Sequence, residues 1–285
     1  MKNMYKIVKK RRLNDTVTLI EVTAPAIAKK ARAGQFIILR VDEYGERIPL
    51  TIADTDKENG TVTVIFQIVG RTTMLLDQLE VGECLADFVG PLGNPSEIEG
   101  IKKAIVVGGG VGCAIAYPIA KALHELGAQV DVIAGFRSKD IVILKDEMEA
   151  ACTNYYLMTD DGTAGEKGFT TTKLQQLLEA DSSYDLVVAI GPVIMMKFTV
   201  ATAKPFGVPT MVSLNPIMID GTGMCGGCRV TINGERKFAC VDGPDFDGYA
   251  VDFDELMSRN AFYKAQETHD KEHVCRLTGG VRNYE

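Results

Sequence analysis

Three cysteines and one aspartate near the C-terminus constrain this chain more than any other feature. The motif runs Asp220-Gly-Thr-Gly-Met-Cys225-Gly-Gly-Cys228, and a third cysteine follows at Cys240. A plant-type [2Fe-2S] loop has the spacing Cys-x4-Cys-x2-Cys with a fourth cysteine farther along, so Asp220 stands where the first thiolate is expected. The intervening glycines allow tight turns that bring backbone N–H groups towards sulfur. The segment therefore predicts an iron-sulfur cluster held by Asp220, Cys225, Cys228 and Cys240.

Two alternatives to this metal site stay open. A Cys-x2-Cys pair with a later cysteine and a carboxylate also suits tetrahedral zinc, although the four-residue spacing before Cys225 is typical of the cluster. A carboxylate carries the same single charge as a thiolate, so Asp220 can replace cysteine without changing the total ligand charge. Asp242 or Cys275 are the other candidates for the fourth ligand.

The composition is that of a globular protein in a reducing compartment. A length of 285 residues predicts two domains of ordinary size, and 46% hydrophobic with 24% charged residues is typical of globular chains. The net charge of −7 argues against a nucleic-acid partner. Seven cysteines, three of them in the metal motif, do not suggest a disulfide framework. With no apolar run of signal or membrane-spanning length, we expect a cytoplasmic protein without a membrane partner.

The first 98 residues have a β pattern. Short segments rich in Val, Ile, Thr and Phe are separated by Gly, Pro and Asp, which predicts an antiparallel β-barrel. The expected strands are residues 16–22, 36–41, 47–53 and 61–69, with one short helix over 72–78.

Residues 99–215 alternate strand and helix patterns, which predicts a parallel sheet covered by helices. A small [2Fe-2S] segment is expected over 216–250, and a polar, helix-prone tail over 251–285 whose narrow apolar stripe includes Phe253, Leu256 and Met257. Within the α/β part, the expected strands are 103–107, 129–134, 155–158, 186–190 and 208–213, and the expected helices are 113–126, 143–151 and 171–179.

A glycine-rich loop between a strand and a helix predicts nucleotide binding. It contains Gly109, Gly110, Val111 and Gly112, and backbone N–H groups at a helix N-terminus can receive a diphosphate there. The G-x-G-x-x-G pattern is incomplete, because Ile115 stands where Gly or Ala is expected.

A second loop, with Gly191, Pro192 and Met195, follows a later strand and so lies at the same edge of the sheet, where it is either a ligand loop or a simple turn. The preference for NAD or NADP stays open from the residues. Arg137 and Lys139 could attract a 2′-phosphate, while Asp131 comes too early on its strand for a ribose-binding acid.

In the β half, Arg47 and the run Gly70-Arg71-Thr72-Thr73 have no role that composition alone assigns. An arginine on a strand is usually a solvated charge, and Gly-Arg-Thr before a helix is usually a cap. Together they could offer a cation and a helix N-terminus to a flavin diphosphate.

The motifs resemble, in order, those of the ferredoxin-NADP+ reductase superfamily: residues 47–52, 90–93, 108–112 and 191–196, and the cluster loop. The resemblance is to the flavin and [2Fe-2S] electron-transfer subunits of dihydroorotate dehydrogenase type. With Asp220 and the run from Met224 to Val230, the chain looks most similar to subunits of electron-bifurcating NADH-dependent ferredoxin:NADP+ oxidoreductases. Asp in place of the first Cys puts a role in pyrimidine synthesis in doubt.

The resemblance implies an FAD-binding barrel, an NAD(H)-binding α/β domain and a [2Fe-2S] domain. It implies that Arg47 pairs with the FAD diphosphate and that residues from two segments hold the flavin: Pro49, Leu50, Thr51 and Ile52, then Ile68, Val69, Gly70, Thr72 and Thr73. It further implies that the two loops of the α/β half contact the nicotinamide nucleotide: Gly109, Gly110, Val111 and Gly112, then Gly191, Pro192 and Met195.

The implied function is hydride exchange between NAD(H) and FAD, followed by single-electron transfer through the cluster. The implied partner is a larger glutamate-synthase-like flavoprotein with further iron-sulfur centres, through which ferredoxin is reached. We expect no catalytic side chain, because the cofactors carry the chemistry and none of His124, His269 and His273 falls in a motif loop. The alternatives are an electron-transfer subunit of dihydroorotate dehydrogenase and a non-catalytic redox sensor.

Overall fold

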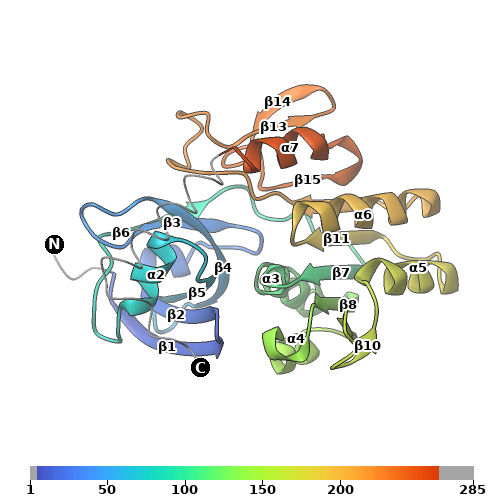
Figure 1. Cartoon of the computed structure of the whole chain (residues 1–285), viewed down its shortest axis with the longest axis horizontal. Coiled ribbons are helices and arrows are strands. Elements are labelled where there is room, and N and C mark those ends of the chain that lie inside the picture. Colours follow the sequence, from blue (N-terminus) through green and yellow to red (C-terminus); the bar gives the residue numbers. More distant parts are fainter. Residues whose placement is uncertain (1–4, 263–285) are drawn as a thin grey trace.

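The computed structural model describes residues 5–262 and contains two large sheets and a small hairpin. Figure 1 shows an N-terminal all-β unit on one side, a layered α/β unit on the other, and the C-terminal segment above the gap between them. The predicted order of an antiparallel sheet followed by a parallel-rich sheet is confirmed.

The N-terminal sheet has six strands in the order β1-β2-β5-β4-β3-β6, and every neighbouring pair is antiparallel. Alternate residues point inwards, so Ile20, Ile37, Val64 and Phe66 form a buried core. The elements are β1 (Ile7–Asn14), β2 (Val17–Thr23), α1 (Pro25–Ala28), β3 (Phe36–Arg40), β4 (Ile48–Asp56), β5 (Thr61–Gln67), α2 (Arg71–Gln78) and β6 (Asp87–Leu92).

The expected closed barrel is not completed by a pairing of named strands. The ends of the strand order, β1 and β6, are linked instead through the segment before β6, where the Ile7 N–H donates to the Glu83 carbonyl and the Leu85 N–H to the Tyr5 carbonyl, each at 2.9 Å. The basic run at residues 9–12 lies inside the edge strand β1, and its side chains are paired rather than only solvated: Lys9 bonds Glu21 and Arg11 bonds Glu147, while Lys10 and Arg12 contact α2.

Helix α2 is anchored to the sheet at its C-terminal end. Lys10 Nζ donates to the carbonyls of Asp77 at 2.7 Å and Leu79 at 2.9 Å, which suits the negative end of a helix. The buried Asp77 carboxylate accepts from Thr18 Oγ1 and Arg12 Nη2, each at 2.6 Å. These contacts are all at the C-terminal end of α2, so its N-terminal end, with Gly70 and Thr72, takes no part in them.

The second sheet has the order β10-β9-β8-β7-β11-β12-β15 and is parallel except for its last pair. Strands β7 and β11 are buried along nearly their whole length, as expected when helices cover both faces. The elements are β7 (Lys103–Gly109), α3 (Gly112–Glu125), β8 (Gln129–Phe136), α4 (Lys145–Ala150), β9 (Asn154–Thr159), β10 (Glu166–Lys167), α5 (Thr170–Ala180), β11 (Leu186–Ile190), α6 (Val193–Ala203), β12 (Thr210–Ser213) and β15 (Asp245–Asp247).

The cluster segment forms a loop followed by the hairpin β13 (Arg229–Ile232) and β14 (Glu235–Phe238), and then α7 (Phe253–Asn260). Phe253 and Leu256 are buried, so the apolar stripe predicted for the tail does dock on the fold. Residues 263–285, the remainder of that predicted tail, lie outside the described residues. In the part of the chain that is described, no helix has the length and apolar character needed to cross a membrane.

One hydrophobic cluster joins the two large units. It includes residues from the outer face of the N-terminal sheet and from α3: Val17, Leu19, Ala53 and Ile65, with Ala114, Ile119 and Leu123. A second cluster brings Phe36 and Ile38 of β3 together with Cys228 and Cys240 of the cluster segment. The cluster segment therefore packs on the N-terminal sheet as well as on the α/β unit. The exact domain boundaries, predicted at residues 98, 215 and 250, remain predictions.

We expect Asp77→Ala to destabilise the N-terminal unit by about 2–4 kcal/mol, because it removes two hydrogen bonds to a buried carboxylate and leaves Thr18 without its acceptor. Urea unfolding followed by circular dichroism measures the change. Glu21→Gln is the control, since the exposed Lys9–Glu21 pair contributes about 1 kcal/mol or less. Equal effects of the two substitutions would contradict the anchoring role.

Candidate functional site

The two predicted nucleotide loops meet at the carboxyl edge of the parallel sheet. Strands β7 and β11 are neighbours, with Gly108 opposite Ile190. A Cβ at Gly191 would lie 3.2 Å from the Gly109 Cα, and one at Gly112 would lie 2.5 Å from the Ile190 carbonyl oxygen. Glycine is therefore required at Gly112, because the start of α3 approaches the backbone of β11 too closely for any side chain.

A cavity of about 720 Å³ opens where these loops meet, which is a usual size for a small-molecule site. The N-terminal ends of α3 and α6 both border it, so two helix dipoles present their positive ends to a bound anion. Every predicted residue of the nucleotide loops lines it: Gly109, Gly110, Val111, Gly112, Gly191, Pro192 and Met195.

The backbone of Gly110 is suited to a ligand that comes close. Its φ is +56°, a left-handed conformation that favours glycine, and a Cβ there would meet nothing within 4 Å. The conformation of the loop, rather than crowding by the protein, therefore accounts for glycine at this position.

Sequence reasoning missed the part of this cavity that comes from the N-terminal sheet. Asn14, Thr16, Val17 and Gln67 line it, and so do Ser213 and Asn215 after β12. Asn14 Nδ2 donates to the Ile141 carbonyl at 3.2 Å, which ties the two walls together. No local motif marks these positions, because only the packing of the two units brings them to the loops.

The position of Asp131 excludes it from ribose binding. Its carboxylate is buried and accepts from Asn154 Nδ2 at 2.7 Å and from the Tyr184 hydroxyl at 2.5 Å, away from the cavity. Arg137 and Asp160 do line the cavity at the carboxyl ends of β8 and β9. Lys139 is not among the lining residues, and its backbone N–H donates to Thr163 Oγ1 at 2.9 Å.

The residues predicted to hold a flavin lie on and beside β4 and at the start of α2, and none of them borders the 720 Å³ cavity; Ile52 borders a smaller cavity of about 270 Å³ beside α3. The Thr72 hydroxyl donates to Glu46 Oε2 at 3.0 Å, which brings the start of β4 beside the N-terminus of α2. Thr73 Oγ1 accepts from the N–H groups of Val69 and Gly70, each at 3.0 Å. The two predicted flavin segments are therefore adjacent in space.

Arg47 links the start of β4 to the cluster segment. Its Nε donates to the carbonyl of Ile219 at 3.2 Å, and its Nη1 lies 3.4 Å from Asp87. A Cβ at Gly221 would lie 2.7 Å from Ile38 Cδ1, so the loop rests directly on β3. The predicted cluster ligands thus begin beside the strand predicted to line the flavin.

The four predicted cluster ligands form two pairs. The Asp220 carboxylate accepts hydrogen bonds from the Thr222 hydroxyl and, at 3.1 Å, from the Cys225 N–H, and these two bonds are the main causes that lower the pKa of Asp220. Burial, and then a hydrogen bond with Cys228, raise the pKa of Cys240 to about 12, so binding of a metal ion must displace its proton.

This donor set fits a binuclear centre, in which each of two irons takes two protein ligands. The N–H of Gly227 points to Cys225 Sγ and that of Cys240 to Cys228 Sγ, both at 3.4 Å, as backbone amides do around cluster sulfur. Within residues 5–262, no three His, Cys, Asp or Glu side chains converge on a single metal position. A mononuclear zinc site with the same four donors matches this arrangement less well.

The two alternative fourth ligands are placed differently. Asp242 Oδ2 accepts from the Phe238 N–H at 2.6 Å and caps the hairpin, while Cys275 lies outside the described residues. His124 is in the last turn of α3 and does not line either cavity, and His269 and His273 also lie beyond the described part.

Comparison with known proteins finds relatives over nearly the whole chain and a family model for the cluster segment. A family model described as the iron-sulfur cluster binding domain of dihydroorotate dehydrogenase B matches residues 215–252. A Thermotoga maritima protein named as a dihydroorotate dehydrogenase B (NAD(+)) electron transfer subunit homolog is 48% identical over 97% of each chain. The corresponding electron transfer subunit of Bacillus pumilus is 32% identical over 88% of this chain and 98% of its own.

A solved structure described as an NADH-dependent reduced ferredoxin-NADP oxidoreductase, in work on flavin-based electron bifurcation, contains a chain that is 46% identical. It superposes with a TM-score of 0.90 over 96% of this chain and 99% of that one. Fold and site thus define an electron-transfer oxidoreductase with a ferredoxin reductase-like architecture. The chain belongs to the family of dihydroorotate dehydrogenase B electron transfer subunits and their homologues.

We expect Gly112→Ala to weaken NADH binding by more than about tenfold, because the new methyl group would collide with the backbone at Ile190 and displace the start of α3. Gly207→Ala is the matched substitution away from the cavity, where the strain of a positive φ costs about 1–2 kcal/mol and a Cβ meets nothing within 4 Å. Titration of the protein with NADH measures both. An equal loss of NADH affinity in Gly207→Ala and Gly112→Ala would contradict this view of the loop.

Proposed function

We propose that this chain exchanges a hydride between NAD(H) and a bound FAD, and passes the electrons singly through a [2Fe-2S] cluster to a partner subunit. The observation that carries the proposal is the contact of the two proposed flavin segments with each other and, through Arg47, with the cluster segment. The N-terminal sheet that bears these segments also forms one wall of the nucleotide cavity.

The α/β loops would hold the nicotinamide nucleotide. In the 720 Å³ cavity the backbone N–H groups at the start of α3 and the left-handed turn at Gly110 suit a diphosphate. Arg137, at the end of β8, has no ion-pair partner among residues 5–262 and faces the same cavity. The resemblance of the chain to NAD(+)-dependent subunits supports NAD(H) as the nucleotide.

The segments on β4 and α2 would hold FAD. Pro49–Ile52 would lie along the isoalloxazine, while Arg47 and the N-terminus of α2 would face the diphosphate. Arg47 would then leave at least one of its contacts with Asp87 and Ile219. The chemistry that FAD supplies when bound is hydride exchange with NAD(H) and release of electrons one at a time.

Asp220 and Cys225 would bind one iron, and Cys228 and Cys240 the other. A carboxylate is a harder donor than a thiolate, so Asp220 gives this cluster a ligand set different from four cysteines, and its potential is tuned accordingly. Ligand exposure differs too, since Cys225 is exposed whereas Cys228 and Cys240 are buried. The exposed side of the loop is where electrons would leave.

The partner we propose is a larger glutamate-synthase-like flavoprotein with its own iron-sulfur centres, as the similarity to the bifurcating oxidoreductase suggests. A dihydroorotate-oxidising partner is the second candidate, favoured by the matches to dihydroorotate dehydrogenase B subunits at 32–35% identity. Co-purification of the tagged chain from its native cell, followed by mass spectrometry, distinguishes the two.

We predict that the isolated chain, prepared without air, contains FAD and iron and oxidises NADH with an artificial acceptor, but does not couple NADPH formation to ferredoxin. Flavin, iron and sulfide assays with steady-state NADH turnover test this. Absence of turnover in a flavin-loaded and iron-loaded protein would favour a redox sensor. Coupled NADP+ reduction by the single chain would contradict the assignment of that step to the partner.

We predict that Asp220→Ala lowers the iron content and changes the low-temperature EPR spectrum of the reduced protein, because one iron loses a ligand. Asp220→Cys should retain the full iron content with a shifted spectrum, since it restores the four-thiolate set. Asp242→Ala is the control and should keep the wild-type spectrum. If Asp242→Ala changes the EPR signal and Asp220→Ala does not, the ligand assignment is wrong.

A further inference from the structure

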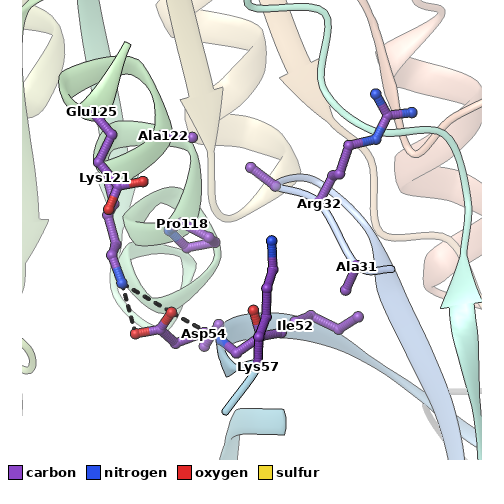
Figure 2. A pocket seen from close by; sticks show the side chains of 12 residues that line it. Ala31, Arg32, Ile52, Asp54, Lys57, Pro118, Lys121, Ala122 and Glu125 are labelled. Atoms are coloured by element: carbon purple, nitrogen blue, oxygen red, sulfur yellow. Dashed lines mark hydrogen bonds and ion pairs between the residues drawn. The ribbon is translucent and has the colours of Figure 1, made fainter. Parts of the chain in front are cut away.

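A second cavity, of about 270 Å³, lies between the N-terminal sheet and the C-terminal half of α3. Figure 2 shows the helix on one wall and the end of β4 on the other, with Lys121 reaching from α3 to Asp54. Lys121 Nζ lies 2.9 Å from each of the two carboxylate oxygens of Asp54. The ion pair therefore spans a place where the two walls are not packed against each other.

Asp54 can reach Lys121 only because β4 contains a bulge. Ile52 pairs with Val64 and points into the barrel core, and Asp54 pairs with Thr63. Ala53 is the extra residue and faces α3. In a regular strand Asp54 would point to the same side as Ile52. The bulge reverses this alternation and directs the carboxylate towards the helix.

Helix α3 also has an irregularity beside this cavity. Pro118 lies within the helix, between the nucleotide loop and Lys121, and lines the same cavity. A proline removes one backbone hydrogen bond and tends to kink a helix. The direction of the half that carries Lys121 is therefore not set by an uninterrupted hydrogen-bond ladder.

Charges around Lys121 favour its protonated form. Burial lowers the pKa of Lys121, but the hydrogen bond and charge of Asp54 outweigh this and raise it, with smaller contributions from Tyr117 and Glu125. The amine also lies 6.0 Å from the centre of the Tyr117 ring. The Lys121 amine is thus charged at neutral pH, although both side chains of the pair remain partly exposed at 34% and 40%.

We propose that the Asp54–Lys121 ion pair is a positioning device, which holds the nucleotide-binding helix α3 at a fixed distance from the flavin-binding strand β4. The proposal rests on the function proposed above. Each element carries predicted cofactor contacts at one end, Gly112 on α3 and Pro49–Ile52 on β4, and one partner of the ion pair farther along. The pair would therefore set how closely the nicotinamide approaches the flavin.

A second ion pair between the same two units provides a matched control. Arg11 of β1 bonds Glu147 of α4, and its exposure is similar, at 48% and 33%. Neither residue lines a cavity described above, and neither element carries a predicted cofactor ligand. If an ion pair only helps to hold the two units together, removing either pair should have the same effect. If the Asp54–Lys121 pair positions α3, only its removal should slow flavin reduction.

The variants are Asp54→Asn, Lys121→Met and their combination. Asparagine keeps an oxygen for the Thr55 N–H, which donates to Asp54 Oδ1 at 2.8 Å. Lys121→Arg is the conservative variant, because a guanidinium can bind the carboxylate in a bidentate manner. Arg11→Gln and Glu147→Gln are the controls.

The full chain, loaded with FAD and cluster, is mixed with NADH, and the rate of flavin reduction is followed at saturating NADH. Since a displacement of about 1 Å costs roughly 100-fold in rate, the smaller displacement expected in Asp54→Asn and Lys121→Met should slow reduction by about tenfold. The double variant should be no slower than the singles. FAD content and NADH affinity should stay within about twofold of wild type, and Lys121→Arg should recover most of the rate.

Two further readouts separate positioning from stability. The nicotinamide–flavin charge-transfer absorption should weaken in Asp54→Asn and Lys121→Met. Amide hydrogen exchange over residues 118–125, measured without nucleotide or flavin, should accelerate. The Tm should fall by no more than about 4 °C, because a partly exposed ion pair contributes little to stability.

Wild-type reduction rates in Asp54→Asn and Lys121→Met would overturn the inference, and so would an equal loss in Arg11→Gln. These results are distinct from a failure of the proposed function, in which wild-type protein would bind no FAD or would not be reduced by NADH at all.

Discussion

The rest of the structure depends on the hydrophobic contact between α3 and the outer face of the N-terminal sheet. Each large aliphatic side chain buried there contributes about 1.5–3 kcal/mol, whereas an ion pair as exposed as Asp54–Lys121 contributes about 1 kcal/mol or less. The apolar cluster therefore holds the two units together. At one edge this apolar contact opens into the 270 Å³ cavity, and there it does not fix the orientation of α3. At that edge the Asp54–Lys121 ion pair connects α3 to the sheet.

The same contact explains why the larger cavity has two kinds of wall. The glycine loops supply backbone N–H groups at the edge of the parallel sheet, and the N-terminal sheet supplies the side chains of Asn14, Thr16 and Gln67. A site at a domain junction is assembled by packing, so its affinity and geometry depend on contacts far from the ligand. In the inference drawn above, Pro118 and the bulge at Ala53 are two such remote features.

The parts of the site that could be predicted from the sequence are those marked by a pattern of neighbouring residues. Glycine spacing after a buried strand predicted the nucleotide loops, and cysteine spacing predicted the cluster segment, because each pattern lies within a few residues. Asn14 and Gln67 could not be found this way, since they reach the cavity only through tertiary packing. The alternation of β4 also misleads at Asp54, because a bulge reverses the side on which that residue lies. Asp131 was predicted to come too early on its strand to bind a ribose, and in the structure its carboxylate is buried against Tyr184.

Arg47 shows how β4, the strand proposed to line the flavin, and the cluster loop depend on each other. Its side chain bonds the Ile219 carbonyl, immediately before the first predicted ligand, and the loop itself rests on Ile38 through a glycine that cannot be replaced without a collision. Moving β4 would therefore move the start of the cluster loop as well. Because β4 is also tied to α3 at its other end by Asp54, one strand connects the nucleotide site to the cluster. In the proposed function, the spacing of the nucleotide, the flavin and the cluster therefore depends on β4.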